Sequence, residues 1–137
     1  MYKNILVPVA FEDGNDAKVK QASEVARSLA AEGARITFLH VMEQIPGYAI
    51  SYLPAGYSAQ VRQAIEDELE GIAAQVEGGV GLVVDGHSGR TILDWAETNS
   101  PDLIVVASHR PGMQDLLLGS TATQVVRHAS CAVFVLR

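Results

Sequence analysis

The last third of the chain, residues 103–137, constrains the fold more than any other stretch. Residues 103–106 form an uninterrupted apolar, mostly β-branched run, which is typical of a strand buried on both faces of a sheet. Residues 131–136 form a second such run, and a polar loop and a segment with helical spacing lie between the two. A helix between two buried strands predicts that the strands are parallel and that the helix crosses over their sheet.

The same alternation extends over the rest of the chain. Apolar runs occupy residues 5–10, 36–41 and 80–85, and residues 19–29, 61–76 and 92–96 place apolar side chains at helical spacing. Five strands alternating with four helices predict an α/β fold, with one parallel sheet covered by two helices on each face. A length of 137 residues fits one domain, residues 1–137, and 48% hydrophobic with 19% charged residues is a globular composition.

Charge and cysteine content limit the expected partners and compartment. The net charge of −6 and the pI of about 5.1 argue against nucleic acid or an anionic membrane as the main partner, since both attract positive surfaces. The single cysteine, Cys131, cannot form an internal disulfide, which favours a reducing compartment. No apolar run approaches the ~20 residues of a membrane span. We therefore expect a cytoplasmic protein without nucleic-acid binding or membrane insertion.

The turn after the first strand, residues 11–16, is acidic. It lacks the glycines of a dinucleotide-binding fingerprint and the Gly-Lys-Ser/Thr end of a P-loop. Glu12, Asp13 and Asp16 would instead repel a phosphate group at this position. Any phosphate must therefore bind elsewhere.

The loop and turn of the last third are better candidates for anion binding. Ligands of open α/β sheets bind beyond the carboxyl ends of the strands, and the helix after the turn points its unpaired N–H groups there. Gly119 lets an anion approach the backbone, and the hydroxyls of Ser120 and Thr121 can donate to it. Arg110 supplies a forked cation and His109 a second donor. The alternative is that Ser120 caps the helix and Arg110 lies in solvent.

Other features have several interpretations. The segment 43–57 is rich in proline, glycine and aromatic residues, so it is either a binding loop or partner contact, or it packs over the helix at 61–76. His40 on a buried strand is more typical of a hydrogen-bonded core histidine than of a catalytic one. Neither Ser108 nor Ser120 lies in the G-x-S-x-G elbow of hydrolases, and no histidine has metal-ligand spacing, so we predict no catalytic residue and no metal ligand.

Seven short motifs, in this order and spacing, resemble those of the universal stress protein family. They are residues 5–9, 40–41, the turn at 86–92, and residues 107–111, 117–120, 125–129 and 131–133. The resemblance covers essentially the whole chain. It is strongest to the small single-domain proteins of the F and G type, in which an Ala-Ser-His-Arg-Pro loop precedes Leu-Leu-Gly-Ser.

The resemblance implies a Rossmann-like fold of the adenine nucleotide alpha hydrolase type, with strand order 3-2-1-4-5. It also implies a site for ATP or another adenine nucleotide. The adenine would contact the backbone around Val41, the ribose would lie near the end of the first strand and Ala107, and the phosphates would lie on the loop and turn of the last third. Carried over by position, the site residues are Pro8, Val9, Val41, Ala107, Ser108, His109, Arg110, Gly119, Ser120 and Thr121.

The chain departs from the family pattern in two places. The family's ATP-binding motif is Gly-x2-Gly-x9-Gly-Ser/Thr, whereas this chain has Ala107 and Arg110 at the first two glycines and a gap one residue shorter before Gly119. The family also has Asp after the Val-Pro-Val of the first strand, on the ribose and metal side of the ligand, and here the residue is Ala10. A Mg²⁺ ion would therefore need a substitute ligand, Glu12 or Asp13, from a turn that bends inward.

We therefore predict an adenine-nucleotide-binding, stress-response regulatory protein whose ligand orders the loop at 109–118 and so changes what an unknown protein partner contacts. The family resemblance also implies a homodimer through the last strand, Ala132–Leu136, whose apolar edge would otherwise invite aggregation. Two alternatives remain open. One is a weak ATPase or phosphotransferase that uses His109. The other is a nucleotide-free dimeric interaction protein, which Ala10 and Ala107 favour.

Overall fold

The computed structural model of the chain describes residues 1–11, 16–108 and 118–137. Its strands form one parallel sheet in the order β3-β2-β1-β4-β5, as predicted. The strands are β1 (Tyr2–Pro8), β2 (Ala30–Met42), β3 (Gly79–Asp85), β4 (Leu103–Ala107) and β5 (Ala132–Leu136). β1 is central, and β3 and β5 form the two edges.

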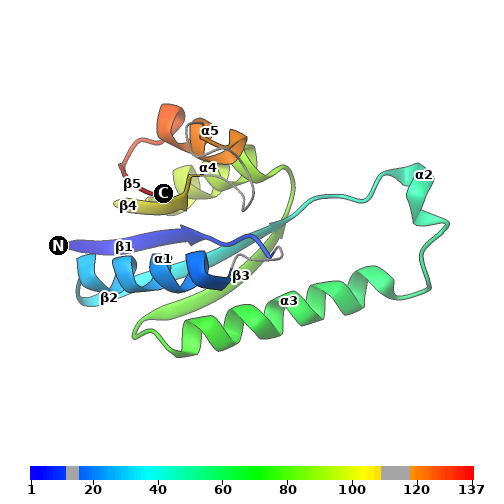
Figure 1. The fold of residues 1–137 in the computed structure, drawn as a ribbon, viewed down its shortest axis with the longest axis horizontal. Helices are drawn as coiled ribbons and strands as arrows, with labels where there is room; N and C mark the ends of the chain where they lie inside the picture. Colours follow the sequence, from blue (N-terminus) through cyan, green and yellow to red (C-terminus); the bar gives the residue numbers. More distant parts are fainter. Residues whose placement is uncertain (12–15, 109–117) are drawn as a thin grey trace.

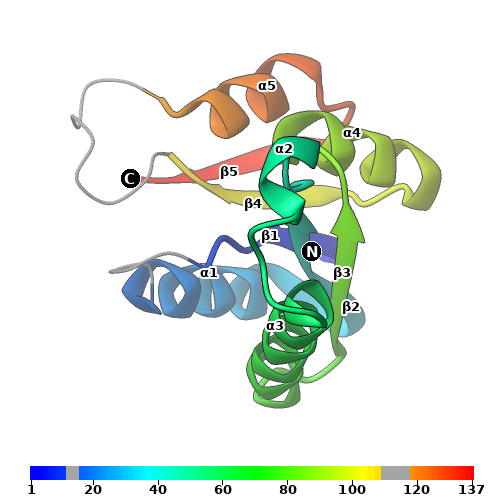
Figure 2. The same cartoon turned by 90° about the vertical axis from the view of Figure 1, so that its right-hand side faces the viewer.

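Two long helices cover each face of the sheet, which confirms the predicted layers (Figures 1 and 2). Helices α1 (Asp16–Leu29) and α3 (Tyr57–Ala74) pack on one face. Helices α4 (Ser88–Asn99) and α5 (Ser120–His128) pack on the other face and against each other. Helices α1, α4 and α5 begin near the carboxyl ends of the strands, whereas α3 begins away from the sheet (Figure 1).

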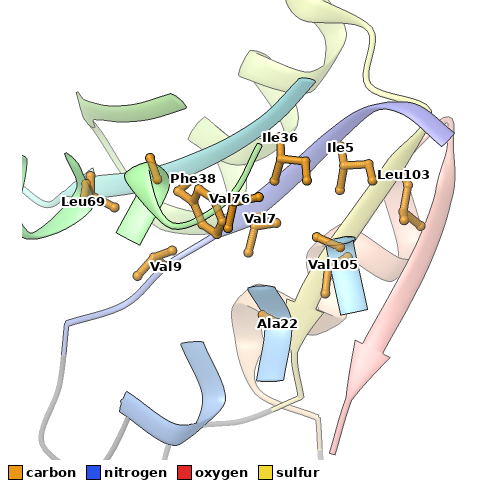
Figure 3. Packing of buried hydrophobic residues seen from close by; sticks show 12 residues of the cluster. Ile5, Val7, Val9, Ala22, Ile36, Phe38, Leu69, Val76, Leu103 and Val105 are labelled. Atoms are coloured by element: carbon orange, nitrogen blue, oxygen red, sulfur yellow. The ribbon is translucent and has the colours of Figure 1, made fainter. Parts of the chain in front are cut away.

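Two apolar layers explain why the strands are uninterrupted hydrophobic runs. Alternate residues of a strand point to opposite faces, so Ile5 and Val7 pack under α1 and α3, whereas Leu6 packs under α4 and α5. Figure 3 shows the first layer, where Val7 of β1 and Val105 of β4 lie close to Ala22 of α1. Burying one such aliphatic side chain contributes about 1.5–3 kcal/mol, so both faces need apolar residues.

The segment at 43–57 contains a short helix that the sequence analysis did not predict, α2 (Gly47–Ile50). In Figure 1 this helix stands away from the sheet, next to the start of α3. Tyr48 and Tyr52 are 82% and 86% exposed, and no residue of α2 is buried. The alternative that this segment packs over the following helix is therefore wrong for these tyrosines.

Each helix in the described part of the chain is too short or too polar to cross a lipid bilayer.

Candidate functional site

A cleft of about 610 Å³ lies at the carboxyl ends of the strands. Its lining comes from the ends of β1, β2 and β4 and from the starts of α1, α4 and α5. The strand order reverses between β1 and β4, and this reversal is where α/β folds of this kind bind ligands. The volume lies within the range of about 300–1,000 Å³ that is typical of small-molecule sites. The cleft is therefore a candidate ligand site.

Eight of the ten predicted site residues line this cleft. They are Pro8, Val9, Val41, Ala107, Ser108, Gly119, Ser120 and Thr121. The other two, His109 and Arg110, lie outside the described residues. Residues that are far apart in the sequence are thus close in space.

Ser108 connects β4 and α5, which border the cleft, to the neighbouring edge strand β5. Its backbone N–H donates to the carbonyl oxygen of Leu136 at 2.7 Å, and its own carbonyl oxygen accepts a hydrogen bond from the N–H of Gly119. The residue is only 2% exposed. The end of β4, the end of β5 and the start of α5 are therefore held together at the cleft.

The start of α5 presents unpaired backbone donors. Its N-cap is Gly119, in extended conformation (φ −65°, ψ 163°), and this residue has no side chain that could form a capping hydrogen bond. The first helical bond runs from the N–H of Thr123 to the carbonyl oxygen of Gly119 at 2.9 Å. Ser120 is the first residue of the helix, so the alternative in which Ser120 is the cap is wrong. The N–H groups of Ser120, Thr121 and Ala122 have no partner among the described residues, and together with the positive end of the helix dipole they favour an anion here.

His40 lies at the border of the cleft and has a structural hydrogen bond. Its Nδ1 is 2.7 Å from the carbonyl oxygen of Val9, and because a carbonyl only accepts, Nδ1 carries the proton. The ring also contacts that of Phe11, with centroids 5.1 Å apart and planes at 56°. His40 is thus hydrogen-bonded, as the sequence predicted, but it is half-buried at the cleft and not a core residue.

Two charged residues of the cleft were missed from the sequence. Lys18 of α1 and Glu43, just beyond β2, both line it. Ser88, the first residue of α4, donates a long hydrogen bond of 3.4 Å from its Oγ to Oε1 of Glu43. The sequence does indicate that Lys18 faces the sheet and not open solvent. It lies four residues before the buried Ala22 and so on the same side of the helix.

The lining does not fit the Mg²⁺ ion that the family resemblance implies. Ala10 offers no side-chain oxygen, and Glu43 is the one carboxylate among the described cleft residues. The described part of the chain contains no group of three or more His, Cys, Asp or Glu side chains that could hold a metal ion. Glu12 and Asp13, the possible substitutes, lie outside it.

Comparison with known proteins decides the family. A sequence model of the universal stress protein family matches residues 1–137. The chain belongs to the universal stress protein family. This universal stress protein is 32% identical over 143 residues to universal stress protein A homolog 2 of Coxiella burnetii, covering 99% of the chain and 95% of the relative. It is 29% identical over 150 residues to universal stress protein G of Salmonella typhimurium, covering all of both chains.

Solved structures give the same result for the fold of this universal stress protein. UspA from Lactobacillus plantarum superimposes with a TM-score of 0.71 at 28% identity, over 99% of this chain and 98% of the other. An Arabidopsis thaliana family member with AMP bound gives 0.65 at 21% identity, over 98% and 90%. A universal stress protein in complex with cAMP gives 0.62 at 20% identity, over 99% and 97%.

Proposed function

We propose that this universal stress protein binds an adenine nucleotide, ATP, ADP or AMP, in the cleft and acts as a stress-response regulator. The observation on which the proposal rests is the start of α5, where uncapped backbone N–H groups border a cleft of nucleotide size. An anionic ligand at that position gains hydrogen bonds that the helix itself cannot supply.

The ligand would extend along the carboxyl edge of the sheet. Adenine would lie beside Val41, and the ribose would contact the end of β1 and Ala107. The phosphates would meet Ser108 and the first turn of α5, with His109 and Arg110 as further donors. Phosphate at a helix start with hydroxyl donors is a recurrent and physically favourable arrangement.

The choice of adenine nucleotide is supported by two structural neighbours. One of them contains AMP and the other contains cAMP. Both ligands combine adenosine with a phosphate group, and the backbone N–H groups at the start of α5 suit such a phosphate. Nucleotide binding would stabilise one conformation of the protein over another, and a partner protein would bind the two conformations differently.

A second candidate is a nucleotide-free interaction protein. It is favoured by Ala10 and Ala107, which replace an Asp and a Gly of the family pattern. The methyl group of Ala107 hinders the close approach of a ligand to the backbone. Ala10 lacks the carboxylate that would contact the ribose side of the ligand.

Freshly purified protein distinguishes these candidates. We expect a raised absorbance ratio at 260 over 280 nm and an adenine nucleotide in mass spectra of the denatured protein, or saturable ATP binding in calorimetry. Arg110→Glu should abolish binding without changing the far-UV circular dichroism spectrum. A protein that carries no nucleotide and ignores added ATP would leave only the interaction protein. Steady ADP release that disappears in His109→Ala would instead favour a hydrolase.

We also propose that β5 pairs with a second copy of this chain. It is an edge strand of five apolar residues, and Phe134 on it is 39% exposed. An apolar edge of this kind is protected when it pairs with its own copy. Light scattering should give a dimer mass for the wild type and a monomer mass for Phe134→Lys, because an edge lysine disfavours pairing. Ile50→Lys, on exposed α2, is the control and should remain dimeric; a monomeric wild type would refute the proposal.

A further inference from the structure

We propose that Lys18 supplies the positive charge opposite the nucleotide phosphates, and that this protein therefore binds its nucleotide without a divalent cation. The inference rests on the proposed function, since it concerns the ligand of the same cleft. It adds a phosphate-binding residue that the family pattern does not contain, and it removes the need for a divalent cation.

The position of Lys18 follows from the packing of α1. Ala22, one helical turn further on, is buried in the layer that contains Val7 and Val105 (Figure 3). Residues four apart lie on the same side of a helix, and one turn rises about 5.4 Å. Because α1 begins at the carboxyl edge of the sheet, Lys18 lies at the open end of this layer and lines the cleft.

Lys18 is available to a ligand. Among residues 1–11, 16–108 and 118–137 it has no ion pair, and the salt bridges there use arginines. It is half-buried, and it is the one lysine or arginine among the described residues that line the cleft. A half-buried ammonium group that faces a cleft gains more from an anion than one in open solvent, because screening is weaker.

The cation and the α5 donors lie on opposite faces of the sheet edge. Helix α1 packs on one face and α5 on the other, and both begin where β1 and β4 end. A phosphate group between them can accept from the N–H groups of α5 on one side and from the ammonium group on the other. Lysine binds phosphate as a compact point charge, so this arrangement does not need bidentate geometry.

Glu43, the carboxylate among the described cleft residues, lies too far from the start of α5 to hold a metal ion against the phosphates. Glu43 follows β2, and β1 separates β2 from β4. Two strand spacings amount to roughly 10 Å. Mg²⁺ in nucleotide sites is held by one or two carboxylates together with the phosphates, in near-octahedral geometry. At the end of β1, where such a carboxylate would be needed, the side chain is that of Ala10.

Calorimetric titration of ATP and of adenosine, each with EDTA and with Mg²⁺, tests the inference. The variants are Lys18→Gln, which removes the charge and keeps most of the length, and Lys20→Gln, an exposed lysine of the same helix outside the cleft. We expect the wild type to bind ATP equally well in both buffers. Lys18→Gln should weaken ATP binding about tenfold and leave adenosine binding unchanged, because adenosine has no phosphate. Lys20→Gln should match the wild type for both ligands.

The outcomes separate this inference from the proposed function. ATP binding that requires Mg²⁺, or an unchanged ATP affinity in Lys18→Gln, would overturn the role of Lys18 and leave the nucleotide site standing. An equal loss of ATP and adenosine binding in Lys18→Gln would show a packing role and would also overturn it. Absence of binding of either ligand to the folded wild type would overturn the proposed function and this inference together.

Discussion

The backbone N–H of Gly119 donates a hydrogen bond to the carbonyl oxygen of Ser108, so the end of β4 and the start of α5 are joined directly. The N–H of Ser108 in turn donates to the carbonyl oxygen of Leu136 at 2.7 Å. These bonds fix the first turn of α5 relative to the sheet. A ligand that accepts from that turn therefore meets donors that are already oriented, which lowers the ordering cost of binding.

Substitution of Gly119 by valine tests whether this turn binds the phosphates. The backbone of Gly119 is extended and not left-handed, so valine can adopt it without strain. Its branched side chain would stand beside the first N–H groups of α5. We expect ATP affinity in calorimetry to fall about tenfold or more, equivalent to roughly 1.4 kcal/mol.

The control for this variant is Gly47→Val in α2. A Cβ atom at Gly47 has no neighbour within 4 Å, and the residue does not line the cleft. It should bind ATP like the wild type. Equal affinities of Gly119→Val and wild type would mean that the phosphates do not contact the start of α5.

The sequence predicts the sheet and the location of the cleft for one physical reason. A strand covered on both faces has no polar positions, so runs such as those that contain Ile5 and Leu103 are recognisable without any partner. Once the strands are parallel, their carboxyl ends share one edge, and residues such as Pro8 and Ser108 must meet there. The family resemblance adds the strand order, which the structure confirms.

Features that depend on distant or irregular contacts could not be predicted. Helix α2 has only four residues and no apolar periodicity. The guanidinium of Arg62 contacts Asp85, 23 residues away, with both Nη1 to carboxylate distances at 3.1 Å, and no local pattern indicates this pair. That carboxylate raises the pKa of Arg62. Lys18 was missed because a lysine in the first turns of an amphipathic helix is usually solvated.

A pair of glycines near the junction of α3 and β3 predicts opposite effects on stability. A Cβ atom at Gly79 would lie 2.3 Å from the carbonyl oxygen of Ala73 and 2.9 Å from that of Val76, and both are backbone atoms that cannot move aside cheaply. Gly79→Ala should therefore lower the free energy of unfolding by about 1–3 kcal/mol. At Gly71, within α3, a Cβ atom meets no atom within 4 Å.

Gly71→Ala is the matched variant. It should raise the free energy of unfolding by about 0.5–1 kcal/mol, because alanine loses less backbone entropy in a helix. Urea titrations of both variants followed by circular dichroism measure the difference. If Gly79→Ala were as stable as Gly71→Ala, the backbone at Gly79 would not lie as close to the carbonyl groups at the end of α3 as the structure places it.

The buried hydroxyl of Thr37 predicts a stabilising substitution. Thr37 lies in β2 with no exposed surface, and its Oγ1 has no hydrogen-bond partner among the described residues. A buried, unpaired hydroxyl loses its hydration without compensation. Thr37→Val keeps the branched shape and should raise the free energy of unfolding by about 1 kcal/mol. Thr37→Ser, which keeps the hydroxyl and loses a methyl group, should be destabilised, and a destabilised valine variant would show that Oγ1 does have a partner.

Asp102 predicts a loss of stability in acid. Its carboxylate accepts hydrogen bonds from the backbone N–H groups of Lys3 at 2.9 Å and Asn4 at 3.0 Å, which tie the start of β1 to the start of β4. Burial on its own would raise the pKa of Asp102, but these backbone hydrogen bonds outweigh it, and the pKa lies below its ordinary value. A carboxyl with a lowered pKa in the folded state stabilises the protein above the unfolded-state pKa of about 4, and this contribution disappears as pH falls through the folded-state value.

Replacing the carboxylate of Asp102 with an amide should therefore lower the free energy of unfolding at neutral pH and leave it nearly unchanged in strong acid. We expect Asp102→Asn to lower the free energy of unfolding by about 1 kcal/mol near neutral pH. The difference from the wild type should shrink steadily below pH ~4, because protonation then removes the same charge from the wild type. Urea midpoints measured across this pH range test the slope, with Glu97→Gln on the exposed side of α4 as the control that should show little difference at any pH. A deficit of Asp102→Asn that stays constant into acid would mean that the charge of Asp102 does not stabilise the join between β1 and β4.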